Sequence, residues 1–191
     1  MTKQILEHLT QTYTVLAIIK VGSQLYYDNP TDLDYLCIIK EPTPKKQFLK
    51  VDNKTVDLLI LSELDYLNKI NLTETLPKHC LFNYQLTFSK TVYKKDNYNL
   101  ILFDMFDKDI KIKYLDILKP YYQNTLGRAI YDPIFGKFYV HYYLIMKMYE
   151  QNSSELTKEI IEDIISLRKS NSNVRGLIAR INNYFKSNEI E

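Results

Sequence analysis

The chain has 191 residues, of which 46% are hydrophobic, and its 25 Lys and Arg against 23 Asp and Glu give a formal net charge of +2. This length allows one domain or two small lobes around a real core, and the low net charge excludes a strong overall electrostatic footprint for nucleic acid. Two cysteines are too few for a disulfide framework. The N-terminus turns amphipathic at once and no apolar run approaches membrane-spanning length, so we expect no signal peptide, no membrane partner and a cytoplasmic protein.

The first 75 residues predict alternating helices and strands. In chain order, we predict a helix over 3–13, a buried strand over 15–19, one or two helical turns over 24–28, a strand over 33–39, a hairpin of 48–51 and 55–61, and a helix capped by Ser62 that ends near residue 70. This order indicates an α/β (α+β) fold, with a small mixed sheet backed by helices. We therefore expect a first domain, the mixed-sheet core, over residues 1–75.

Residues 76–191 predict a mainly helical lobe. The segment 80–92 is ambiguous between helix and strand, whereas 98–107 and 110–126 have helical character, with Pro120 as a break or kink in the second. Further helices are expected after Gly136, after Thr157 and around Leu177 to Tyr184, separated by loops rich in Asn and Ser.

Two closely spaced acids start the strand predicted over 33–39. Asp32 and Asp34 are two residues apart, so both carboxylates project from the same face of a strand. Like charges this close repel each other unless a cation lies between them, and carboxylate oxygens suit a hard cation such as Mg²⁺. A third carboxylate on a neighbouring strand, Asp57, would complete a two-metal site of the kind that handles phosphates.

A Gly-Ser pair lies between the first strand and the following helical turns. Gly22 lets the backbone approach a phosphate, and the Ser23 hydroxyl together with exposed N–H groups can donate to an anion. Phosphate donors beside metal-binding acids are what phosphoryl or nucleotidyl transfer requires. Farther along, Lys137 and His141 are spaced to share one helix face. Lys137 either reaches the triphosphate or extends its amine to solvent at the helix start, and His141 is more simply a satisfied core residue.

These residues together resemble a known family. The pattern Gly22-Ser23 followed by Asp32-Leu33-Asp34-Tyr35, with Asp57 beyond, is similar to the nucleotidyltransferases related to DNA polymerase beta, in particular their small bacterial and phage-encoded members. The resemblance is specific in residues 21–36 and vague after residue 62. It implies that Gly22 and Ser23 hold a nucleoside triphosphate.

The same resemblance implies roles for the acids and names a reaction. Asp32 and Asp34 would coordinate two Mg²⁺ or Mn²⁺ ions, and Asp57 would bind the catalytic metal and help activate an acceptor hydroxyl. The implied function is a magnesium-dependent transfer of a nucleoside monophosphate from a triphosphate such as ATP. The acceptor stays open among an RNA end, a protein side chain and a small molecule.

Two departures from the family pattern keep a second interpretation open. The glycine usual a few residues after the serine is Tyr27 here, and the loop before Asp32 is slightly short. The missing glycine favours a non-catalytic module that binds a nucleotide or a partner on the same fold, as an antitoxin or regulator would. The three intact acids favour the enzyme.

Overall fold

The computed structural model describes most of the chain up to Asp104 and isolated positions beyond it. The described residues are 1–25, 30, 32–42, 45–51, 53–71, 73, 82–83, 86–87, 89–104, 107, 109–110, 113, 116, 162 and 183. The chain divides into two compact units, Met1–Asp104 and Met105–Glu191. The first unit thus includes residues 76–104, which the sequence pattern places in the helical lobe, and most of that lobe lies outside the described residues. No helix of the described part is long and apolar enough to cross a membrane.

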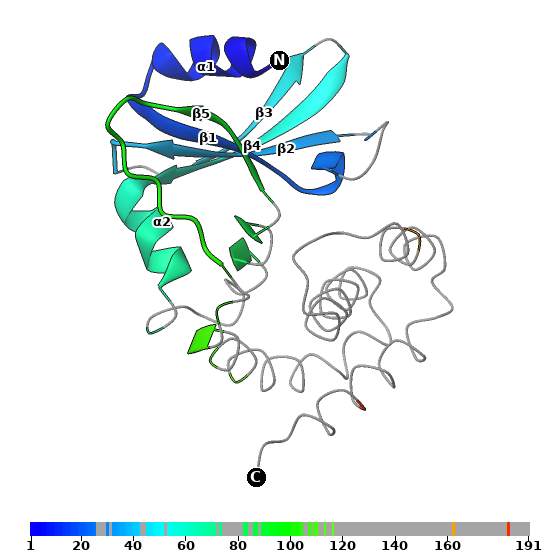
Figure 1. The fold of residues 1–191 in the computed structure, drawn as a ribbon. Coiled ribbons are helices and arrows are strands. Elements are labelled where there is room, and N and C mark those ends of the chain that lie inside the picture. Colours follow the sequence, from blue (N-terminus) through cyan, green and yellow to red (C-terminus); the bar gives the residue numbers. More distant parts are fainter. Residues whose placement is uncertain are drawn as a thin grey trace. The chain divides into compact units, whose positions relative to one another are not determined.

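The first unit is built on one five-stranded mixed sheet with the strand order β3-β4-β2-β1-β5 (Figure 1). Its elements are α1 (Thr2–Thr10), β1 (Val15–Val21), the short 3₁₀ helix η1 (Ser23–Leu25), β2 (Asp32–Ile39), β3 (Lys45–Val51), β4 (Lys54–Ser62), α2 (Glu63–Ile70) and β5 (Lys90–Lys94). Strands β2 and β4 run parallel, and the other neighbouring pairs are antiparallel. The predicted α/β fold with a small mixed sheet is confirmed.

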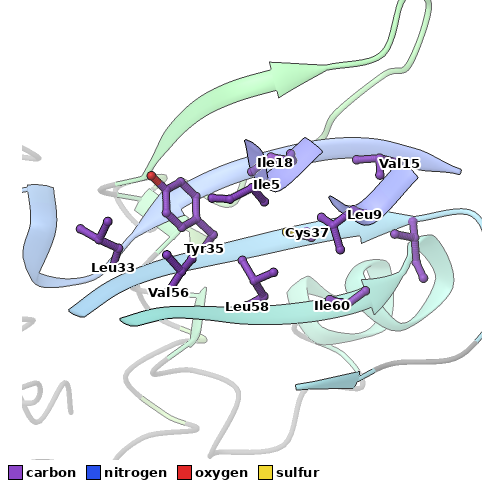
Figure 2. Close-up of a cluster of buried hydrophobic side chains, with 11 residues drawn as sticks. Ile5, Leu9, Val15, Ile18, Leu33, Tyr35, Cys37, Val56, Leu58 and Ile60 are labelled. Atoms are coloured by element: carbon purple, nitrogen blue, oxygen red, sulfur yellow. The ribbon is translucent and has the colours of Figure 1, made fainter. Parts of the chain in front are cut away.

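Helix α1 covers one face of the sheet (Figure 2). Every second residue of β2 and of β4 points toward Ile5 and Leu9 of this helix. The residues that do so are Leu33, Tyr35, Cys37 and Ile39 of β2 and Val56, Leu58 and Ile60 of β4. Burial raises the pKa of the Cys37 thiol to about 12, so this cysteine is a core residue and not a nucleophile. Because strand side chains alternate, the residues between them, including Asp34 and Asp57, point to the opposite face.

Helix α2 lies on the opposite side of the sheet from α1 (Figure 1). Its Tyr66 is fully buried, and the phenol hydroxyl donates a 2.6 Å hydrogen bond to the carbonyl oxygen of Ile101. Burial raises the pKa of this phenol, so it remains a donor at any physiological pH. The bond ties the chain after β5 to the helix.

The helix predicted over 98–107 is wrong for its described residues, because 98–104 contain no helical turn. Side chains of Tyr66 and Thr87 donate to carbonyl oxygens within this segment at 2.6 and 3.2 Å, respectively. These carbonyls therefore bond to other parts of the unit and not to an intrahelical N–H. Tertiary contacts here override a modest helical propensity.

The segment 80–92, which is ambiguous in sequence, contains both kinds of structure. Residues 82–83 and 86–87 are helical, and Lys90 begins β5. Strand β5 pairs with β1 and forms one edge of the sheet. Its exposed lysines, one at each end of the strand, protect this edge from pairing with another chain.

Replacing Ser62 by alanine tests the local origin of α2. The Ser62 hydroxyl accepts a 3.1 Å hydrogen bond from the Asp65 N–H and donates a 2.6 Å bond to the Asp65 carboxylate, as predicted for an N-cap. Loss of such a cap costs about 1 kcal/mol. We expect Ser62→Ala to lower the free energy of unfolding by that amount in urea titrations, and Ser62→Asp to restore most of it. Equal stability of Ser62→Ala and wild type would show that the cap contributes nothing.

Candidate active site

Three aspartates lie at the same end of β2 and β4, on the face away from α1. The parallel register pairs Asp34 with Asp57 and Asp32 with Thr55. Paired residues of neighbouring strands point to the same side, with their backbones about 4.8 Å apart. Asp32 is exposed, and Asp34 and Asp57 are half-buried. The register therefore places Asp34 beside Asp57, with Asp32 one step along on the same face.

The turn after β1 lies against the Asp34 side chain. Val21, the last residue of β1, pairs with Asp34, and Gly22 follows with a φ of 76°, a left-handed conformation that favours glycine. A Cβ on Gly22 would overlap with Oδ2 of Asp34 and would lie 3.0 Å from its Cγ. The Leu25 N–H donates to the Gly22 carbonyl oxygen at 3.2 Å and closes the turn. Only a glycine allows this turn and the Asp34 carboxylate to lie so close together.

The donor set fits a hard divalent cation. Carboxylate oxygens are the ligands that Mg²⁺ and Mn²⁺ prefer, and the register places two carboxylates side by side. In the part of the chain that the structure describes, no group of three or more His, Cys, Asp and Glu side chains is placed to hold a metal ion. The Asp34 carboxylate lies toward Gly22. Convergence of all three carboxylates on an ion therefore belongs to the proposal below.

Gln24 is a site-adjacent residue that sequence reasoning did not single out. Its side chain is 7% exposed, and its amide nitrogen donates to the Val21 carbonyl oxygen at 3.0 Å and to the Asp34 carbonyl oxygen. It thus bridges the end of β1 and the acid-bearing part of β2. No sequence signal marks this role, because it depends on how closely the two strands approach.

Phe48 is a second residue that the sequence did not point to. It pairs with Asp57 across β3 and β4, so it belongs to the same face as the aspartates. The side chain is 64% exposed, which is unusual for a large aromatic residue. Its neighbour on that face of β3, Lys50, is also exposed. An aromatic ring therefore lies on the Asp57 side of the aspartates, opposite the Gly22 turn.

Several predicted site residues lie outside the described part. Lys137 and His141 fall there, as does Tyr27, which replaces the usual loop glycine. The backbone of Ser23 begins η1, but its side chain is not described. The predicted roles of Ser23 and Lys137 toward a triphosphate therefore stay predictions.

Comparison with known proteins indicates the fold. No protein-family model matches the sequence, and no curated protein matches it. Among solved structures, the chain is similar to the spectinomycin adenyltransferase AAD(9) from Enterococcus faecialis, crystallised with ATP and spectinomycin, with a TM-score of 0.52 and 16% identity over 97% of this chain and 96% of that one. It also matches a nucleotidyltransferase-like protein from Exiguobacterium sibiricum 255-15, with a TM-score of 0.38 and 12% identity over 97% of this chain and 73% of that one.

The first of these similarities extends over nearly the full length of both chains. The chain therefore has the fold of a nucleotidyltransferase. Because one fold hosts many activities, the activity has to be argued from the site itself.

Proposed function

We propose that this chain is a divalent-metal-dependent nucleotidyltransferase that moves a nucleoside monophosphate from ATP or another triphosphate to a hydroxyl group of a small molecule. The observation that carries the proposal is the register of Asp34 and Asp57 on parallel strands, directly beside the Gly22 turn. Two adjacent carboxylates provide a cation site, and the Gly22 turn lies against one of them, where its backbone would meet a triphosphate bound through the cation. The adenyltransferase of similar fold was crystallised with ATP and a small molecule, which supports this choice of substrates.

The reaction assigns a task to each part of the site. The acceptor oxygen bonds to the α-phosphorus while the bond from that phosphorus to the oxygen bridging to the β-phosphate breaks, and the electron pair leaves with pyrophosphate. The hydroxyl proton passes to the Asp57 carboxylate, the proposed general base. Asp32, Asp34 and Asp57 would hold the metal, which when bound neutralises charge on the phosphates. Gly22 lets the triphosphate approach the backbone.

A label-transfer assay tests the proposal. The protein is incubated with each α-labelled triphosphate, Mg²⁺ or Mn²⁺, and either spectinomycin or a small-molecule fraction of a cell extract, and products are identified by mass spectrometry. We expect label on a small molecule together with released pyrophosphate. Label on RNA or protein would support the transferase activity but would show that the acceptor is not a small molecule. Binding of the triphosphate without transfer to any fraction would favour the non-catalytic module.

Phe48 gives a test of the acceptor side. Because the ring is exposed and lies beside the proposed base Asp57, we expect it to contact the acceptor and not the triphosphate. Truncating an aromatic contact costs about 1–3 kcal/mol, so Phe48→Ala should raise the KM for the acceptor roughly tenfold. The KM for the triphosphate should stay unchanged in the same steady-state assay.

The control for Phe48 is Leu64→Ala. Leu64 is 68% exposed on α2 and is as accessible as Phe48. This variant should leave both KM values at their wild-type levels. A Phe48→Ala enzyme with unchanged acceptor KM would contradict the assignment.

A further inference from the structure

The buried amide of Gln24 joins the two halves of the proposed site. The Gly22 turn comes from the end of β1, and Asp34 comes from β2. The strand pairing of β1 with β2 ends at the pair Val21 and Asp34. Gln24 lies just beyond that last pair and is bonded to the carbonyl oxygens of both residues.

The orientation of this amide is fixed by chemistry. Both partners are carbonyl oxygens, which only accept, so the NH₂ group of Gln24 must face them. The amide oxygen Oε1 then points away, and it is buried with no hydrogen-bond partner among the described residues. A buried acceptor without a hydrogen-bond partner lowers the stability of the folded state. Stability alone therefore does not account for glutamine at this position.

We propose that Gln24 is a positioning residue, which holds the phosphate-binding turn of Gly22 at a fixed distance from Asp34. The assignment rests on the proposed nucleotidyl transfer, since it concerns the spacing between triphosphate and metal ligand. With the Gln24 amide in place, the turn and the aspartate move as one body. Without it, the turn pivots about the end of β1, and the triphosphate loses its alignment with the metal ligands. Misplacement by about 1 Å is enough to slow such a reaction strongly.

Three variants separate positioning from simple packing. Gln24→Met keeps the length and apolar bulk but has no donor. It removes the unpaired Oε1 but also takes the donor away from the carbonyl oxygens of Val21 and Asp34, so we expect a modest loss of stability. Gln24→Glu keeps the shape, but its ionised carboxylate would face two carbonyl oxygens. Gln24→Asn keeps the amide on a shorter side chain and serves as the conservative variant.

The kinetic outcome distinguishes the two roles. We expect Gln24→Met to raise the KM for the triphosphate and to lower kcat, each by roughly threefold, so that kcat/KM falls roughly tenfold, as expected for a lost hydrogen-bond bridge of about 1.4 kcal/mol. The acceptor KM should not change, and Gln24→Asn should recover part of the loss. Wild-type kinetics in Gln24→Met, or a loss of melting temperature with unchanged kinetics per folded molecule, would overturn the assignment.

The pH dependence of Gln24→Glu provides a readout that needs no turnover. Beside two carbonyl oxygens a buried carboxyl has its pKa raised above the unfolded value of about 4.3. Its protonated form can donate to one carbonyl. The deficit in stability relative to wild type is therefore largest near pH 7 and shrinks as the pH falls through the raised pKa, and it is nearly gone below the unfolded pKa.

The difference between Gln24→Met and wild type should not depend on pH. If the wild-type protein neither binds nor transfers a triphosphate, the proposed function fails. The stability of Gln24→Glu relative to wild type then still decides whether the Gln24 amide bridges Val21 and Asp34. A Gln24→Glu protein as stable as wild type at pH 7 would refute the bridge, because its carboxylate has no hydrogen to donate to the two carbonyl oxygens.

Discussion

Replacing Asp34 by asparagine should reduce the rate of nucleotidyl transfer by about 10³-fold or more. Without the bound metal, the charge that develops on the phosphates in the transition state loses several kcal/mol of stabilisation, and each 1.4 kcal/mol corresponds to a tenfold change in rate. The asparagine side chain has nearly the same shape as that of aspartate but no charge to hold a cation beside Asp57. The variant also relieves repulsion between two adjacent carboxylates, so the melting temperature should not fall appreciably. The measurement is the initial rate of label transfer, with thermal unfolding of the same samples.

Asp96→Asn is the matched control for Asp34→Asn. Asp96 is exposed and follows Lys95, whose N–H donates a hydrogen bond to the carbonyl oxygen of Leu16. Leu16 lies near the start of β1, at the end of that strand away from Gly22. This variant carries the same change of charge and should transfer at the wild-type rate. An Asp34→Asn protein that keeps more than a tenth of the wild-type rate would show that Asp34 is not a metal ligand in the reaction.

Replacing Gly22 by alanine should damage both activity and stability. The residue has φ of 76°, which costs an alanine about 1–2 kcal/mol. The new Cβ would also overlap with the Asp34 carboxylate, so either this carboxylate rotates away or the turn shifts, and both displace groups of the proposed site. A displacement of this size in a catalytic site costs about 10²-fold in rate. We therefore expect about a hundredfold slower transfer, together with a lower free energy of unfolding.

Asn53→Ala is the control that separates the effect of backbone strain from the effect of the contact between Gly22 and Asp34. Asn53 has φ of 63° in the turn between β3 and β4, so alanine there meets the same backbone penalty. It is exposed and lies beyond the ends of both strands, outside the proposed site. It should lose comparable backbone stability and keep full activity per folded molecule. If both variants lost activity in proportion to stability alone, the contact between Gly22 and Asp34 would have no special role.

The sheet could be predicted because its signals are local. Apolar runs along β2 and β4 predict buried strands, and the two-residue spacing of Asp32 and Asp34 already placed both carboxylates on one face. Ser62 was identified as a cap from its neighbours alone. The chemistry of the acids suggested that Asp57 lies on a strand neighbouring that of Asp32 and Asp34. The register that pairs Asp34 with Asp57 was not predicted, because a sequence does not specify which residues of two strands lie opposite each other.

The parts that could not be predicted depend on contacts between distant segments. The chain at 98–104 has helical composition, but bonds from Tyr66 and Thr87 hold it in an irregular path. Gln24 looks like an ordinary polar residue until β2 brings the Asp34 carbonyl oxygen within its reach. Phe48 reads as one apolar residue of a hairpin strand, and only the register with Asp57 places it at the site.

Binding of Mn²⁺ in the presence of a non-hydrolysable ATP analogue tests the central claim most directly. Electron paramagnetic resonance of free Mn²⁺ reports the number of ions bound per chain for the wild type and for Asp34→Asn, Asp57→Asn and Asp96→Asn. The account predicts analogue-dependent Mn²⁺ binding in the wild type and Asp96→Asn, and its loss by at least tenfold in affinity in the other two. Equal Mn²⁺ affinity in all four proteins would contradict it.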